Sequence, residues 1–274
     1  MMNLQNSYNQ VVILFDEQGT PTFREDRETN FFLGVSVMYD LSAEDFIFDQ
    51  SRILFGLSNT GALRNIKISN SRAVEISQLL PELPIQIVIS ILDLSDIEFQ
   101  RVVNLYRDFG DIMRERYRNV RGRPIAQILH PQVLDDCIFN SICDYSERNQ
   151  INSSFLVFID DWSIPVNDIE IYLEDRSRSF QEKINSLHSE FNYGFEINVA
   201  EILLLNQDSY RKRFIGIIAS VVSRAFLNND NVRYSEVPLN NILSSEINQK
   251  NDITNKVKQL LIDVMDDSSR NPPL

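Results

Sequence analysis

The chain has 274 residues, of which 43% are hydrophobic and 24% charged, with 8 glycines and 9 prolines. This composition belongs to a folded globular protein and excludes a disordered, collagen-like or low-complexity chain. The net charge of -13, from 39 acidic and 26 basic residues, supplies no overall basic surface for binding nucleic-acid phosphates. A nucleic-acid role therefore requires positive charge that is locally concentrated or supplied by a partner.

Three further features of the sequence bear on location. No run of about 18 apolar residues is present, which excludes a transmembrane helix. The first ten residues carry no charge, unlike the basic start of a signal peptide. The two cysteines lack the spacing of a disulfide framework, which is typical of a reducing compartment. We therefore expect a cytoplasmic protein that does not enter the membrane.

Strands are expected where apolar and β-branched residues run together, at 10–15, 30–39, 85–94, 153–159 and 195–205. Helices are expected where apolar residues recur at helical spacing, at 42–55, 72–80, 95–123, 131–145, 177–191, 208–225 and 252–265. For four of these helices the predicted starts are Ser42, Ser95-Asp96, Pro131 and Asp208-Ser209. Residues 228–251 are polar and predict a loop.

An opening β-hairpin followed by alternating strands and helices predicts an α/β fold. We expect one domain over residues 1–274. Residues 95–150 are a candidate helical insert, and residues 252–274 form a C-terminal helix with a loose tail.

Two predicted strands end in acidic doublets, Asp16-Glu17 and Asp160-Asp161. Catalytic groups of open α/β sheets gather at the carboxyl ends of strands. Carboxylates brought together there repel each other unless a cation lies between them, and Mg²⁺, or Mn²⁺ in its place, prefers carboxylate oxygen. This arrangement serves two-metal phosphoryl chemistry. Acids that follow a strand are also common turn residues, so spacing alone leaves both interpretations open.

The opening VVILFDEQGTPTF, followed by NFFLGVSVMYD, resembles the start of a widespread bacterial family of uncharacterised proteins with a ribonuclease H-like fold. That family begins with a strand ending in Asp-Glu-Ser-Gly. Asp16, Glu17 and Gly19 match this motif, and Gln18 stands in place of the serine. Asp160 matches a further strand-end acid of the family.

Two other family motifs are altered. Asn65-Ile66-Lys67 stands where the family has Glu-x-Lys, so the lysine is present and the acid is not. In the late helix, Ser220 stands where the family has the aspartate of Gln-x-Ala-Asp. Two of the four acids that the resemblance implies for a metal site are therefore neutral, which lowers the affinity for a divalent cation.

The resemblance implies a ribonuclease H-like domain and a nucleic-acid-directed, Mg²⁺-dependent phosphodiester hydrolase of a bacterial defence or mobile-element system. Asp16 and Asp160 would hold the metal, Glu17 or Asp161 would add a ligand or orient water, and Lys67 would steady the phosphate. The alternative is a catalytically degenerate relative that serves as a binding or scaffolding subunit of a multi-protein complex.

A cluster of arginines interrupts the acidic chain between the third strand and Pro124. Arginine binds phosphate with bidentate geometry, so the cluster predicts contact with nucleic acid or with an acidic partner protein. In the other interpretation, acids within four residues of these arginines neutralise the same helix face. Both interpretations stay open. The candidate contact residues are Arg107, Arg114, Arg118, Arg121 and Arg123, with Arg213 from the late helix.

Overall fold

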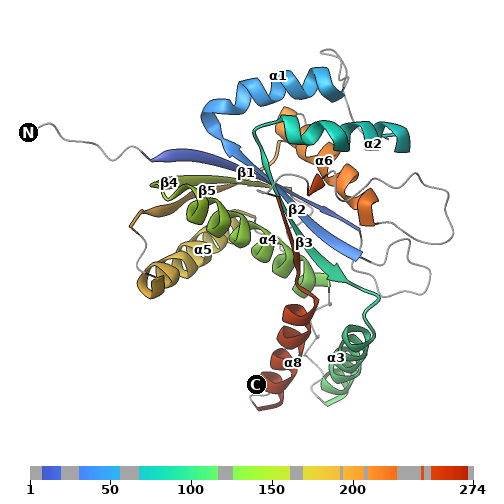
Figure 1. Ribbon diagram of the computed structural model, residues 1–274. Coiled ribbons are helices and arrows are strands. Elements are labelled where there is room, and N and C mark those ends of the chain that lie inside the picture. The colour runs from blue at the N-terminus through green and yellow to red at the C-terminus, as the bar shows by residue number, and fades with distance from the viewer. Residues whose placement is uncertain are drawn as a thin grey trace, which may run out of the picture.

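The computed structural model of the chain describes residues 8–19, 31–55, 68–116, 126–160, 169–191, 194–206, 209–226, 242–243 and 248–270. In this part of the chain, a six-stranded mixed sheet in the order β5-β4-β1-β2-β3-β6 carries helices on both faces, which is the predicted α/β fold (Figure 1). The strands are β1 (Asn9–Gln18), β2 (Phe31–Asp40), β3 (Gln86–Asp93), β4 (Ser153–Ile159), β5 (Ile197–Leu204) and β6 (Gln249–Asp252). The helices are α1 (Glu44–Phe55), α2 (Asn70–Leu79), α3 (Ile97–Arg116), α4 (Ala126–Asn149), α5 (Ile169–Phe191), α6 (Tyr210–Phe226) and α8 (Thr254–Arg270).

The direction of the strands determines where a site can form. β2 pairs antiparallel with β1 and β3, whereas the pairs β1–β4, β4–β5 and β3–β6 are parallel. The carboxyl ends of β1, β4 and β5 therefore lie together at one edge of the sheet. β1 is central, with β4 on one side and β2 on the other, so its end lies in the middle of that edge.

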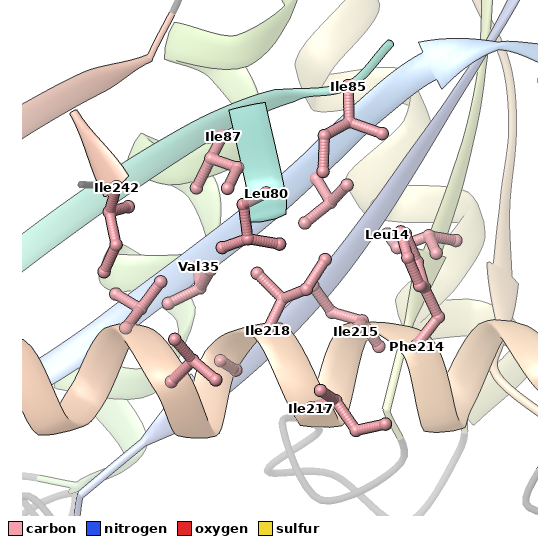
Figure 2. Packing of buried hydrophobic residues seen from close by; sticks show 14 of the residues in the cluster. Leu14, Val35, Leu80, Ile85, Ile87, Phe214, Ile215, Ile217, Ile218 and Ile242 are labelled. Atoms are coloured by element: carbon pink, nitrogen blue, oxygen red, sulfur yellow. The ribbon is translucent and has the colours of Figure 1, made fainter. Parts of the chain in front are cut away.

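One face of the sheet is covered by α1, α2 and α6. The apolar residues that predicted the late helix are all buried, as their helical spacing requires. Figure 2 shows Phe214 and Ile218 of α6 on the side of the sheet that carries Leu14 and Val35, with Leu80 beside them. Burying each of these side chains contributes roughly 1.5–3 kcal/mol, so α6 is fixed firmly over β1.

The opposite face of the sheet is covered by α4 and α5. Alternate residues of β1 divide between the two faces: Leu14 packs with α6, whereas Ile13 and Phe15 pack with α4 and α5. β1 is therefore buried on both faces, which explains its nearly continuous apolar sequence.

Gly34 of β2 allows α4 to approach the sheet closely. A Cβ at this position would lie 2.7 Å from Val133 Cγ1 and 3.0 Å from Phe15 Cε2. We expect Gly34→Ala to lower the free energy of unfolding, measured in urea, by about 1–3 kcal/mol, because packed neighbours must move. Gly110→Ala in α3 is the matched control: a Cβ there meets nothing within 4 Å, and alanine should add about 0.5–1 kcal/mol. A Gly34→Ala protein with the same free energy of unfolding as wild type would contradict this close approach of α4 to the sheet.

α3 and α8 lie side by side at one end of the molecule (Figure 1). They share a third apolar cluster, which includes Phe99 and Val103 of α3 and Val257 and Leu261 of α8. The predicted start of α3 is confirmed, because Asp96 Oδ1 accepts a hydrogen bond of 2.6 Å from the backbone N–H of Phe99. None of the helices in the described ranges combines the length and apolarity needed to cross a bilayer.

The predicted end of β1 and the predicted start of α4 are wrong. β1 does not end before Asp16: it continues to Gln18, because Glu17 and Gln18 still pair with β2. Pro131 does not start a helix but lies inside α4, which begins at Ala126. A proline at this point removes one backbone hydrogen bond, and the packing of α4 against the sheet compensates for that loss.

Other boundaries also differ from the prediction. Residues 249–252 form β6, where a loop was predicted to residue 251 and a helix from residue 252. Their sequence QKND has no apolar run, and pairing with β3 makes them a strand. Ser42 lies in a 3₁₀ turn, Leu41–Ala43, and α1 begins at Glu44. α5 begins eight residues before the predicted position 177, and α8 extends to Arg270.

Candidate functional site at the ends of β1 and β4

Asp16 lies near the end of β1 on the face that α6 covers. It is two residues from Leu14, and alternate residues of a strand share a face. The residue is 9% exposed. Its carboxylate accepts hydrogen bonds from the backbone N–H of Glu17, at 3.0 Å, and from Gln18 Nε2, at 3.3 Å. Gln18 therefore helps to hold this carboxylate.

Asp160 directly follows β4, the parallel neighbour of β1. The parallel register pairs Leu14 of β1 with Phe158 of β4. Two places further along both strands, Asp16 and Asp160 therefore come next to each other on the same face. Asp160 is 6% exposed. Two carboxylates thus lie at the ends of neighbouring strands in surroundings from which most water is excluded.

Lys212 reaches these acids from the first turn of α6. Ser209 caps that turn, because its Oγ accepts a hydrogen bond of 3.2 Å from the backbone N–H of Lys212. The Nζ of Lys212 donates to Asp160 Oδ2 in an ion pair, and its charge also acts to lower the pKa of Asp16. The Lys212 side chain is 21% exposed, so water screens the pair only weakly. The ammonium group of Lys212 therefore acts on both carboxylates.

Burial shifts the pKa values of this acid and base toward each other. Burial raises the pKa of Asp16 above its ordinary value of 3.8, although the charge of Lys212 and the N–H of Glu17 oppose the shift. Burial also lowers the pKa of Lys212 below 10.5, although the charges of Asp16 and Glu17 oppose it. Perturbed titratable groups at the ends of sheet strands are characteristic of functional sites.

The part of α6 above Asp16 carries no acid. Lys212, Gly216 and Ser220 are four residues apart and therefore share one face of the helix. Gly216 lies close to the site, since a Cβ there would be 3.9 Å from Asp16 Oδ2. The whole sequence of α6 contains no aspartate or glutamate. The face of α6 on this side thus carries a lysine, a glycine and a serine, and no acid.

These residues do not fit a magnesium ion in this arrangement. Mg²⁺ takes about six oxygen ligands in octahedral geometry, usually several waters together with one or two carboxylates that are free to face it. Asp160 is bound to Lys212, and α6 adds no carboxylate. Among the described residues, no three side chains of His, Cys, Asp or Glu gather into a group that could hold a metal ion.

Glu17 leaves β1 on the face opposite to Asp16. Its charge acts to raise the pKa of Tyr172 on α5, where burial is the larger cause. The guanidinium of Arg176 lies 5.0 Å from the centre of the Tyr172 ring and forms an ion pair of 2.5 Å with Asp135 of α4. Glu17 therefore leaves β1 toward the α4–α5 side of the sheet, while its charge also acts on Asp16 and Lys212.

Arg211, which precedes Lys212, has a structural role. Arg211 forms two hydrogen bonds of 2.8 Å with Glu44, and its guanidinium lies 4.3 Å from the centre of the Phe158 ring. Glu44 also accepts a hydrogen bond of 2.7 Å from Tyr39. Arg211 thus ties α6 to α1. Arg213, the third basic residue of this turn, is partly buried on α6.

The structure places only part of the predicted site. Arg107 is exposed on α3. The backbone of Arg114 is part of α3, but the structure does not describe its side chain. Also outside the described residues are Lys67, Asp161, Arg118, Arg121, Arg123 and the altered motif position Asn65.

Lys212 is the site residue that sequence reasoning missed. Lys212 directly precedes Arg213, the arginine of the late helix that the sequence predicts to contact nucleic acid or an acidic partner. A signal for its actual position was present. α6 follows β5, and the carboxyl end of β5 lies at the same edge of the sheet as the ends of β1 and β4.

No protein-family model matches the chain, and a search of curated proteins finds no match to it. The geometry at this edge of the sheet combines two buried carboxylates, one lysine and a helix face without acids.

Proposed function

We propose that the chain is a ribonuclease H-like protein without a hydrolytic metal site, which serves as a binding or scaffolding subunit of a larger complex. The observation that carries this proposal is the ion pair of Lys212 with Asp160 beside Asp16. The mixed sheet with an opening antiparallel hairpin and flanking helices supports the ribonuclease H-like part, because the resemblance of the first 40 residues implies that architecture.

The chemistry of the site supports a non-hydrolytic role. Metal-assisted phosphodiester hydrolysis needs a cation that polarises the phosphate and activates water. A protonated lysine is a compact charge with three donors and no open coordination position, so it can bind a phosphate oxygen but cannot coordinate and activate water. Lys212 neutralises part of the charge of the carboxylates and, with Phe214 close behind it, fixes α6 against β1 and β4.

A second candidate is the metal-dependent nuclease that the resemblance implies. The specific observation in its favour is that β1 and β4 are parallel neighbours, in register up to Leu14 and Phe158, two residues before Asp16 and Asp160. This candidate requires Lys212 to leave Asp160, and it would place the protein in a bacterial defence or mobile-element system.

Metal binding and cleavage separate the two candidates. We expect no saturable binding of Mg²⁺ or Mn²⁺ by calorimetry, no shift of the melting temperature with either ion, and no cleavage of labelled single-stranded DNA, duplex DNA or RNA. The physical reason is that Lys212 already holds Asp160. Mn²⁺-dependent cleavage by the wild-type protein, lost in both Asp16→Asn and Asp160→Asn, would establish the nuclease and overturn the proposal.

The Lys256→Met protein serves as the control for loss of an ion pair elsewhere in the fold. Lys256 of α8 pairs with Asp136 of α4, away from the ends of β1 and β4, so its loss should leave the metal experiments unchanged. The scaffolding role has its own readout. A complex isolated with the tagged chain from its native host should form in the same stoichiometry when Asp16 is changed to Asn, because assembly does not use the carboxylate.

A further inference from the structure

The outer face of α3 carries large apolar side chains in water. Ile97, Leu105 and Ile112 are 69%, 58% and 52% exposed, although the opposite face of the same helix is buried against α8. At 100° per residue, three polar residues lie on the same stripe, which is roughly 100° wide. Among the side chains of α3 that the structure describes, residues 97–112, six lie on this α3 stripe and all are exposed: Ile97, Arg101, Asn104, Leu105, Asp108 and Ile112.

The α3 stripe is complementary to itself when it is reversed. Counting outward from the point between Asn104 and Leu105, Ile97 corresponds to Ile112, and Arg101 corresponds to Asp108. A two-fold axis at that point would place two copies of α3 antiparallel. Ile97 of each copy would then face Ile112 of the other, and Arg101 would face Asp108, so every outer pair is apolar with apolar or cation with anion.

From this symmetry we infer that α3 is the contact surface of a homodimer, in which two copies of the chain pair antiparallel through the α3 stripe. The occupant is a second copy because the pattern of apolar and charged residues matches its own reverse, a condition that an unrelated partner would not impose. Figure 1 shows α3 at the periphery of the molecule with α8 beside it. The inference does not depend on the proposed function, because the stripe does not include Asp16, Asp160 or Lys212.

The charges of the α3 stripe are available for such pairing. Arg101 lies 2.6 Å from Glu98 on the same helix, but both side chains are more than half exposed. An exposed pair three residues apart contributes about 0.3–0.5 kcal/mol, so Arg101 can exchange Glu98 for Asp108 of a second copy at little cost. A contact through one helix is small, and we therefore expect a dimer that dissociates on dilution.

Sedimentation velocity of the full chain tests the inference. Between roughly 1 and 500 µM, the range in which small interfaces associate, the mass should rise from 31.8 kDa toward twice that value. Leu105→Glu should abolish the rise, because it buries two like charges next to the two-fold axis. Ile53→Glu on α1, at a residue that is 74% exposed, is the matched control and should leave the rise unchanged.

A charge exchange tests the antiparallel register itself. Arg101→Glu and Asp108→Arg should each weaken association at least tenfold, because each single change places like charges opposite one another twice. The double change Arg101→Glu with Asp108→Arg should restore association to within about threefold of wild type. A chain that stays monomeric at every concentration, a dimer unaffected by Leu105→Glu, or a double variant as weak as the single variants would overturn the inference.

Discussion

Replacing Lys212 with methionine is expected to lower the free energy of unfolding at pH 7 by about 3–5 kcal/mol, because removing one partner of a buried ion pair leaves an uncompensated charge. Asp16 and Asp160 are both buried, and the Lys212 ammonium is the cation that acts on them. Methionine preserves most of the apolar stem of lysine, so the loss reports on the charge more than on packing. Urea unfolding followed by circular dichroism measures the difference.

The loss should depend on pH in a defined direction. The pKa of Asp16 in the folded protein lies above its ordinary value of 3.8, so its protonated form favours folding. The stability that this carboxyl contributes is complete below about pH 4 and is lost as the pH rises through the folded pKa. Without Lys212, that pKa rises further. The difference between wild type and Lys212→Met should therefore be large at pH 7 and small near pH 4.

Lys256→Met provides the comparison for this experiment. Asp136, the partner of Lys256, is also buried, but it keeps hydrogen bonds from Ser90 Oγ and Asn140 Nδ2. The side chain of Lys256 is 57% exposed, so water screens its charge. We expect a loss of less than about 1 kcal/mol for an ion pair of this kind. Equal losses in the two variants, or a loss in Lys212→Met that is the same at pH 4 and pH 7, would contradict the buried ion pair.

Replacing Phe214 with alanine is expected to lower the free energy of unfolding by about 3–5 kcal/mol, because the variant loses buried apolar area and leaves a cavity. Phe214 is fully buried in the cluster that fixes α6 to the sheet. Its ring centre lies 5.6 Å from that of Phe48 and 6.1 Å from that of Phe55. Urea unfolding at pH 7 measures the loss.

Phe46→Ala is the matched control for this substitution. Phe46 lies on α1, but it is 55% exposed, and we expect a change within about 0.5 kcal/mol, as at ordinary surface positions. If the two substitutions cost the same, the cavity argument for Phe214 fails. Because Phe214 is two residues from Lys212, Phe214→Ala also loosens the first turn of α6, and the pH dependence of stability due to Asp16 should change with it.

The α/β fold could be predicted because its main elements carry strong local patterns. The central strands are apolar on both faces, and α6 repeats its apolar residues at helical spacing, so each element is encoded within its own segment. β6 could not be predicted, since the polar residues of QKND become a strand only by pairing with β3. The start of α4 before Pro131 likewise depends on the packing of that helix against the sheet.

Part of the candidate site follows from the amino-acid order alone. Asp16 and Asp160 come at or near the ends of two apolar strands, and a general rule for α/β sheets places such ends at a common edge. Local sequence was enough for this because strand length and direction depend on patterns a few residues long. Which cation meets those carboxylates depended on folding. Lys212 is 52 residues from Asp160 along the chain and reaches it because α6 packs across the sheet. The charge of a buried group depends on its neighbours in space, and those neighbours are brought together by packing over distances that no local pattern encodes.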